Sequence, residues 1–123
     1  MSEFSTLGVS DELIRGLNEL GIVEPTEIQL KGLPLLLDDT SDLVCRSETG
    51  TGKTVTFGIP LLQSIDPNLA RIQGLILVPT RELAKQIAKQ LFKFTKYYHK
   101  VFTEAVYGEL EKLLGDLLGK QLF

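Results

Sequence analysis

Residues 43–54 read Leu-Val-Cys-Arg-Ser-Glu-Thr-Gly-Thr-Gly-Lys-Thr, and this stretch decides the fold class of the chain. The apolar run at 43–45 is typical of a strand buried in a parallel sheet. It leads directly into a glycine-rich loop, and a helical pattern follows as far as about Ser64. A strand, a glycine-rich turn and a helix in this order predict a loop that binds phosphate.

The chemistry of the loop supports this prediction. Glycines let backbone N–H groups turn inward around an anion, and the helix that follows points its positive end at the same place. Lys53 would bring a full charge to the outer phosphates, as the catalytic residue, and the Thr54 hydroxyl would bind Mg²⁺. The alternative is a glycine-rich turn capped by Thr54. The predicted cofactor-binding loop comprises Ser47, Glu48, Thr49, Gly50, Thr51, Gly52, Lys53 and Thr54.

Outward from the loop, helical patterns alternate with short apolar runs. Apolar residues at helical spacing, with capping residues before them, predict helices over 11–20, 26–37, 53–64 and from 80 onward, kinked at Pro34 and Pro60. Apolar runs predict buried strands at 43–45, 75–78 and 101–106. This alternation predicts an α/β fold, with a parallel sheet of about three strands and helices on both faces.

Composition places the chain among soluble globular domains, with 43% hydrophobic and 24% charged residues. No apolar run approaches the roughly 20 residues that span a bilayer, and the first residues do not resemble a secretory signal. The single cysteine, Cys45, cannot form an internal disulfide, and its apolar neighbours predict that it is buried in the core. These features suggest a cytoplasmic protein.

The net charge of −3 is unevenly distributed along the chain. Six basic residues against one acidic residue give a balance of +5 over residues 81–100. Four of the basic residues recur at a spacing of four, so they would form one ridge of a helix. Such a ridge is either a solvated helix face or a contact surface for RNA. The four residues are Arg81, Lys85, Lys89 and Lys93.

The phosphate loop resembles that of the DEAD-box RNA helicases, which belong to helicase superfamily two. That family has a small residue where the general phosphate-loop pattern has its first glycine, and Ser47 fits this variation. The resemblance implies a partial RecA-like fold, specifically the first part of the N-terminal RecA-like domain. It also implies ATP and Mg²⁺ as cofactors and RNA as the partner.

A second segment, residues 21–29, looks like the Q motif of the same family. Phe4 lies 17 residues before Gly21, where the family has an isolated aromatic residue. The resemblance implies that Phe4 packs on adenine, that Gln29 reads the adenine edge, and that Thr26 belongs to the same cofactor-binding set. From the residues alone, Thr26 and Gln29 also fit a capping box, and Phe4 also fits a core position.

A third segment, residues 79–84, resembles motif Ia of the family. The resemblance implies that Pro79, Thr80 and Arg81 contact the sugar-phosphate backbone of single-stranded RNA, and that Gly108 stands at a glycine doublet with a similar role. The chain has only one glycine there. Thr80 is equally suited to cap the helix that follows it.

Beyond Gly108 the resemblance ends, and no Asp-Glu-Ala-Asp segment follows. The acids of that segment would orient Mg²⁺ and the attacking water. We therefore divide the chain into a truncated RecA-like ATP-binding domain at 1–108 and an amphipathic leucine-rich tail helix at 109–123. The tail would cover exposed sheet surface or form a homodimer through residues 110–123.

The leading hypothesis is an ATP-binding fragment of a DEAD-box RNA helicase, an enzyme by family but inactive as this chain alone. The alternative is a non-catalytic interaction module that dimerises through the leucine-rich helix. A small P-loop kinase is a third hypothesis, but the sequence offers neither a substrate lid nor a second acidic motif.

Overall fold

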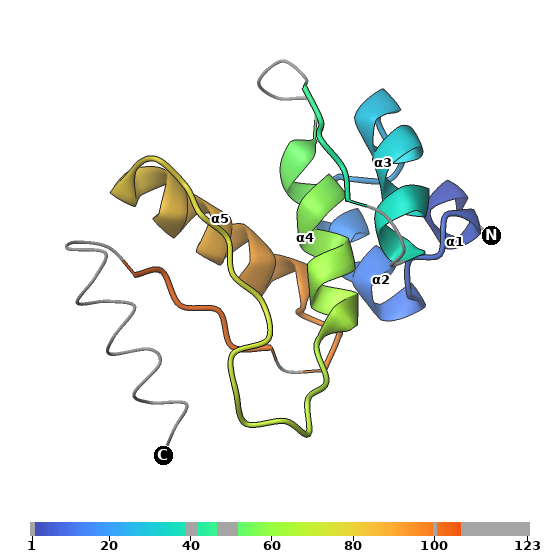
Figure 1. Cartoon of the computed structure of the whole chain (residues 1–123). Coiled ribbons are helices and arrows are strands. Elements are labelled where there is room, and N and C mark those ends of the chain that lie inside the picture. The colour runs from blue at the N-terminus through green and yellow to red at the C-terminus, as the bar shows by residue number, and fades with distance from the viewer. Residues whose placement is uncertain (1, 39–41, 47–51, 100, 107–123) are drawn as a thin grey trace.

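The structure is a computed structural model that describes residues 2–38, 42–46, 52–99 and 101–106. The regular elements of this part are five helices: α1 (Glu3–Thr6), α2 (Asp11–Glu19), α3 (Glu27–Leu37), α4 (Lys53–Ser64) and α5 (Arg81–Phe94). Helix α4 packs between α3 on one side and α5 on the other, while α2 contacts both α1 and α5 (Figure 1). Within these described ranges, no helix is long and apolar enough to cross a membrane.

The helices begin and end close to the residues that the sequence predicted. Ser10, Thr26 and Thr80 are the N-cap residues of α2, α3 and α5. The Thr80 hydroxyl accepts a hydrogen bond from the backbone N–H of Leu83 at 3.1 Å. The Ser10 side chain makes no such bond, and its oxygen is buried without a partner among the described residues. The short helix α1 was not predicted, because its four residues are too few to show a helical pattern.

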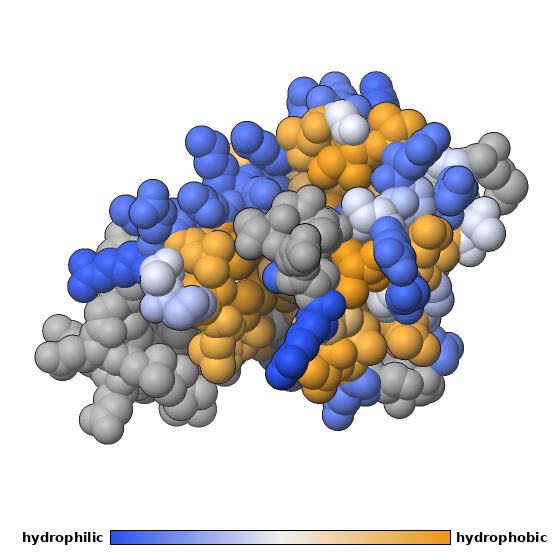
Figure 2. Space-filling model, turned by 90° about the horizontal axis from the view of Figure 1, so that it is seen from above, coloured by the Kyte–Doolittle hydropathy of each residue, from blue (hydrophilic) through white to orange (hydrophobic). Residues whose placement is uncertain are grey.

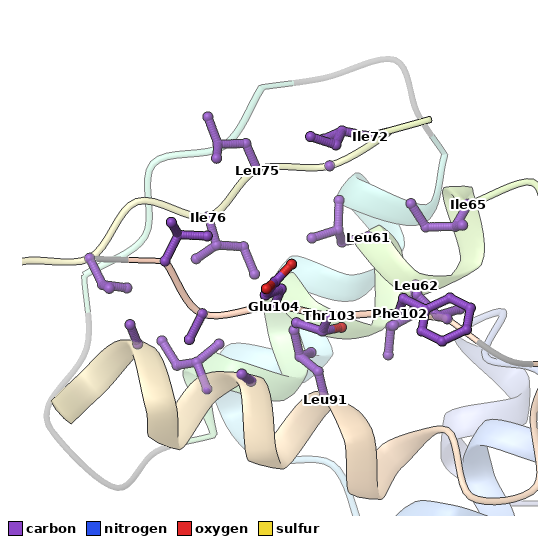
Figure 3. Close-up of a pocket in the computed structure, with 18 of the residues that line it drawn as sticks. Leu61, Leu62, Ile65, Ile72, Leu75, Ile76, Leu91, Phe102, Thr103 and Glu104 are labelled. Carbon is purple, nitrogen blue, oxygen red and sulfur yellow. The ribbon is translucent and has the colours of Figure 1, made fainter. Parts of the chain in front are cut away.

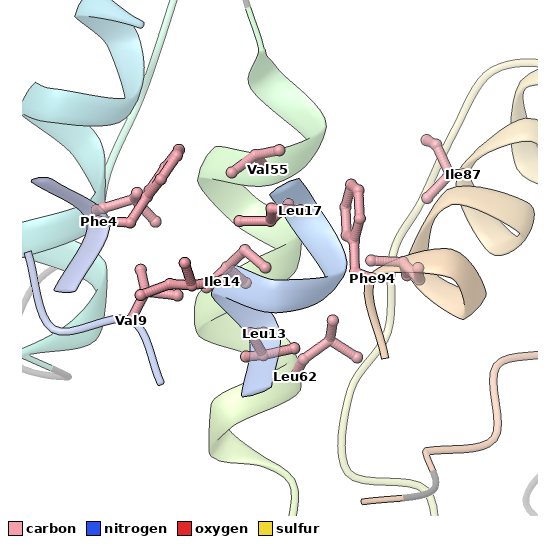
Figure 4. Close-up of a cluster of buried hydrophobic side chains, with 12 residues drawn as sticks. Phe4, Val9, Leu13, Ile14, Leu17, Val55, Leu62, Ile87 and Phe94 are labelled. Carbon is pink, nitrogen blue, oxygen red and sulfur yellow. The ribbon is translucent and has the colours of Figure 1, made fainter. Parts of the chain in front are cut away.

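The core forms where the apolar faces of the helices meet. Phe4 from α1 and Leu13 and Leu17 from α2 belong to one buried cluster with the apolar side chains of α4, and Phe94 joins it from the end of α5 (Figure 4). All of these side chains are at most 2% exposed. The predicted inward face of α5 is confirmed, because Ile87 and Leu91 are buried while the neighbouring lysines are exposed.

Helices α3 and α4 approach each other closely at a glycine. A Cβ atom on Gly32 would lie 2.5 Å from Cγ2 of Thr56, a distance that real Cβ atoms do not reach. The absence of a side chain at residue 32 therefore allows the two helices to pack against one another. This close approach brings the first turn of α3 beside the first turn of α4, where the predicted site lies.

The three predicted strands are not paired in the described part of the chain. Residues 42–46, 72–78 and 101–106 have no helix, turn or strand pairing (Figure 1), and we call them the irregular segments. Along the second of these, Ile76 and Val78 pack against the core, whereas Leu75 and Leu77 are 62% and 75% exposed. The prediction of a fully buried strand was therefore wrong for alternate side chains.

The prediction that Cys45 is buried was also wrong, because the structure exposes it. Its neighbour Val44 is 95% exposed. A strand of a parallel sheet is buried only when other strands flank it and further elements cover both faces. Without those neighbours the run remains at the surface, and hydrophobic residues reach the exterior in patches on the face seen in Figure 2.

Candidate functional site

The candidate site lies where the N-terminal turns of α3 and α4 meet, and one buried amide joins them. Gln29, 1% exposed, accepts a hydrogen bond from the backbone N–H of Thr26 at 2.9 Å through Oε1. Its Nε2 donates to the carbonyl oxygen of Gly52, the N-cap of α4, at 3.1 Å. The capping box predicted for Thr26 and Gln29 is present. The same side chain also bonds to the end of the phosphate-loop segment.

Gly52 has a backbone that only glycine adopts without strain. Its φ of +88° lies in the left-handed region, and a Cβ atom there would overlap Nε2 of Gln29. The Gly52 carbonyl accepts a second bond, from the Thr56 hydroxyl at 3.1 Å, and Thr56 is 3% exposed. Sequence analysis did not single out Thr56; its position four residues after a glycine N-cap was the available signal.

Lys53 and Thr54 occupy the first turn of α4 beside this glycine. Lys53 is exposed and Thr54 is half-buried, so both are accessible from the solvent side of the helix N-terminus. Unpaired N–H groups at a helix N-terminus attract anions, and the Lys53 charge adds to the same field. The other predicted loop residues, Ser47, Glu48, Thr49, Gly50 and Thr51, lie outside the described residues.

The first turn of α3 also carries an exposed ion pair. Lys31 Nζ lies 2.9 Å from Glu27 Oε1, one helical turn away. The hydrogen bond from Lys31 and its positive charge hold the pKa of the Glu27 carboxyl below its ordinary value. Glu27 is therefore a paired carboxylate near neutral pH. Its side chain faces solvent.

Phe4 does not lie at the surface in this structure. It is 0% exposed and belongs to the core cluster (Figure 4). This is the packing role that the sequence left open as an alternative. Adenine stacking on Phe4 stays a prediction, and it would require the side chains that cover the ring to move.

The residues predicted to contact RNA lie at the start of α5. Pro79 and Arg81 are exposed on either side of the Thr80 cap. In the sequence they form a group separate from Gln29, Gly52 and Lys53. Gly108, the fourth predicted RNA contact, lies outside the described residues.

A cavity of about 410 Å³ lies elsewhere, between α4, α5 and the irregular segments 72–78 and 101–106 (Figure 3). Its walls are mainly aliphatic, with Leu61 and Leu62 from α4, Leu91 from α5, and Ile76 and Phe102 from the two segments. Among the described residues, no predicted phosphate-binding or RNA-contacting residue lines it. Its apolar lining is suited to packing and offers few groups for a charged nucleotide.

A polar cluster fixes the end of α5 to α2. Tyr97 donates a hydrogen bond to Glu19, Lys96 forms an ion pair with Glu19 at 2.9 Å, and Arg15 lies 4.1 Å from the centre of the Tyr97 ring. The Tyr97 hydrogen bond, with the Lys96 interaction, lowers the pKa of Glu19. The ion pair correspondingly raises the pKa of Lys96.

No group of three or more His, Cys, Asp or Glu side chains in the described ranges is arranged to hold a metal ion. Thr54, the residue predicted to bind Mg²⁺, lies in the described part of the chain. A hydroxyl alone does not bind Mg²⁺ strongly, because this ion usually needs carboxylate and phosphate oxygens together with water.

Comparison with known proteins gives a consistent family. The model of the DEAD/DEAH box helicase family matches residues 26–120. The matched range includes Thr26, Gln29 and all predicted phosphate-loop residues, but not Phe4. It extends past Gly108, where we expected the resemblance to end.

Curated relatives agree with this match. An ATP-dependent RNA helicase CshA from Listeria monocytogenes is 42% identical over 108 residues, which are 88% of this chain and 20% of the relative. An ATP-dependent RNA helicase DeaD from Escherichia coli is 42% identical over 112 residues, 88% of this chain and 18% of the relative. The chain thus spans about a fifth of the length of these relatives.

Solved structures give the same result for the fold. A DEAD box protein from Methanococcus jannaschii superposes with a TM-score of 0.81 at 34% identity, covering 93% of this chain and 31% of that chain. Dbp5 from S. cerevisiae, bound to RNA and ADP BeF3, superposes with a TM-score of 0.79 at 27% identity, covering 98% and 34%. These likenesses confirm the predicted fold class, a partial RecA-like α/β domain.

Proposed function

The chain belongs to the DEAD/DEAH box helicase family, and from that premise we propose that it is an ATP-binding part of an ATP-dependent RNA helicase. The observation that carries the proposal is the Gln29 amide, which bonds to both the N-cap of α3 and the N-cap of α4. It couples the segment that resembles the Q motif to the end of the phosphate loop. The curated relatives are named as ATP-dependent RNA helicases, which supports the same activity here.

ATP with Mg²⁺ suits the residues that surround Gly52. No side chain fits at residue 52, because Gln29 and Thr26 occupy that space and the backbone there is left-handed. Lys53 would hold the outer phosphates by charge, and the α4 N-terminus would add its N–H groups. Thr54 would orient Mg²⁺, and Ser47–Thr51 would complete the phosphate loop. When bound, ATP supplies the phosphoryl group for transfer, and Mg²⁺ neutralises its charge.

Adenine selection is the finer part of the proposal. The bond to Gly52 uses one N–H of the Gln29 Nε2, and the bond from Thr26 uses one lone pair of Oε1. A second N–H and a second lone pair therefore remain for a base. Because Gln29 is 1% exposed, it would read the adenine edge with these groups only after the residues that cover it shift. Phe4 would stack on adenine only after the helix α1 that carries it shifts.

We propose that RNA binds at the start of α5. Pro79, Thr80 and Arg81 are exposed there, and a helix N-terminus beside Arg81 attracts a phosphate of the RNA backbone. Gly108 would add a contact from the segment beyond. We propose that hydrolysis and unwinding need an Asp-Glu-Ala-Asp segment in addition, which these 123 residues do not contain. We also propose a cytoplasmic location, which suits the exposed thiol of Cys45.

Isothermal titration with ATP, ADP and GTP, with and without Mg²⁺, tests the nucleotide site. We expect Lys53→Ala to reduce ATP affinity at least tenfold and Lys31→Ala, an exposed lysine on α3, to leave it unchanged. Gln29→Glu keeps the acceptor for Thr26 but removes the amide donor, and we expect it to reduce discrimination between ATP and GTP. Equal affinity of the unchanged chain for ATP and GTP would contradict the adenine-reading role.

The alternative function is a non-catalytic module that dimerises through residues 110–123. No described contact favours it over the nucleotide-binding proposal. Light scattering of the full chain and of a chain ending at Gly108 tests it directly. A monomer in both measurements contradicts the dimer, and a dimer only in the full chain supports it.

A further inference from the structure

Helix α5 presents an aromatic ring to solvent in the middle of a basic face. Phe92 is 74% exposed, whereas Phe94, two residues later on the same helix, is 2% exposed. The helix therefore buries one phenylalanine in the core and leaves the other outside. A single exposed apolar side chain is common at a protein surface, and Phe102 is exposed as well, so it is the charge around Phe92 that makes its environment informative.

The charges around the ring are basic. Lys89 stands three residues before Phe92 and is its neighbour on the helix surface, Lys93 is adjacent in sequence, and Lys96 follows just after the helix ends at Phe94. All three lysines are exposed. Helix α5 itself carries four basic residues and a single acidic one, Glu82 in its first turn. Lys96 forms an ion pair with Glu19, so the net positive charge near the ring comes mainly from Lys89 and Lys93.

An exposed aromatic ring among lysines matches the chemistry of a single-stranded nucleic acid. Bases stack on aromatic side chains while basic residues follow the phosphates, and this combination binds any sequence. A protein partner fits less well, because the centres of protein interfaces are depleted in lysine. The basic face also continues from Arg81, the residue at the start of the same helix, to Phe92 over about 16 Å.

We propose that Phe92, with Lys89 and Lys93, is a stacking site for one base of single-stranded RNA beyond the proposed contacts at Thr80 and Arg81. The inference rests on the proposed RNA binding and adds a second point of attachment to it. A short RNA would reach only the start of α5. A longer RNA would also reach Phe92, so the contribution of this ring would depend on RNA length.

The test uses fluorescence anisotropy of the full chain with labelled RNAs of about 2 and about 16 nucleotides, at low salt. Phe92→Leu keeps an apolar side chain but removes the ring, and we expect it to weaken binding of the longer RNA about tenfold while leaving the shorter one unchanged. Phe92→Tyr keeps the ring and should restore the affinity. Lys89→Gln should lower the salt dependence for the longer RNA, whereas Lys31→Gln should not.

Photocrosslinking supplies an independent measurement. RNA that contains 5-iodouridine should crosslink to the Phe92 peptide in the longer complex, and circular dichroism should show that each variant keeps its helix content. Arg81→Gln separates this inference from the proposed function. If Arg81→Gln weakens both RNAs but Phe92→Leu weakens neither, the inference is wrong and RNA binding at the start of α5 stands.

Two other outcomes also overturn the inference. If the chain binds ATP but neither RNA, both RNA proposals fall while the nucleotide site stands. If poly-glutamate displaces the longer RNA with the same dependence on the Phe92 ring, the basic face is a site for acidic protein. Binding of the longer RNA that depends on the ring and resists poly-glutamate supports it.

Discussion

The helices and the irregular segments of this chain contain similar aliphatic side chains, yet these side chains are buried in the helices and largely exposed in the segments. Leu17 in α2 and Ile59 in α4 are 0% exposed. Leu77 and Val44, from two of the segments predicted to be strands, are 75% and 95% exposed. The apolar character of a run therefore did not decide whether its side chains are buried.

The difference follows from how each element satisfies its backbone. A helix pairs its N–H and C=O groups internally, so an amphipathic helix needs only one apolar neighbour to be stable in a fold. A strand pairs its backbone with neighbouring strands, and a strand of a parallel sheet is also covered on both faces. The described residues supply helix partners for the helices but no strand partners for the three apolar runs.

The largest effect should come from the same substitution made in both regions. Leu17→Ala removes a fully buried side chain from the centre of the core, and we expect it to lower the free energy of unfolding by about 2–5 kcal/mol. Leu77→Ala removes an exposed side chain and should change it by no more than about 0.5 kcal/mol. Urea denaturation followed by circular dichroism measures both. Equal losses would mean that Leu77 is buried in solution.

A smaller effect is expected where the loop joins α4. Gly52→Ala places a side chain at a left-handed backbone position and against Nε2 of Gln29, so it should cost about 2 kcal/mol of stability. It should also weaken ATP binding, because the end of the phosphate loop moves. Gly21→Ala, which has a positive φ but no neighbour within 4 Å of the added Cβ, is the matched control. Unchanged ATP affinity in Gly52→Ala would contradict the role of this contact.

The helix cap at the start of α5 should contribute less. Thr80→Ala removes the acceptor for the Leu83 N–H, and we expect a loss of about 1 kcal/mol. Thr80→Ser keeps a hydroxyl and should retain most of the stability. If both variants weaken RNA binding equally while only Thr80→Ala loses stability, Thr80 contacts RNA through more than its hydroxyl.

The smallest effect should come from the exposed cluster between α2 and the end of α5. The pKa of Glu19 is lowered in the folded chain, so its interactions stabilise the fold above the ordinary carboxyl pKa and are lost as pH falls through the lowered value. Glu19→Gln should therefore reduce the melting temperature slightly at neutral pH and not at all in strong acid. Tyr97→Phe should raise the Glu19 pKa in a carboxyl NMR titration. No change in that pKa would mean that the Tyr97 hydrogen bond is absent in solution.

The sequence predicted the helical part of the fold and part of the site. The caps at Thr26 and Thr80, the helix end at Gly21 and the inward face of α5 follow from local rules, and the structure confirms them. The family itself is confirmed by the match over residues 26–120, whereas the roles of Gln29 and the phosphate loop stay predictions. The burial of Cys45, Leu75 and Leu77 was predicted wrongly, since it depends on partners that are distant in sequence.

By itself, the sequence determined where four of the five described helices, α2 to α5, begin and end, and it predicts a phosphate loop before Lys53. These properties depend on residues within one or two turns of each other. Only the tertiary structure decided that Gln29 bonds to Gly52 across 23 residues, that Phe4 is buried, and that Phe92 is exposed beside buried Phe94. Contacts between segments that are far apart in the chain depend on how the helices pack, and no local pattern specifies that packing.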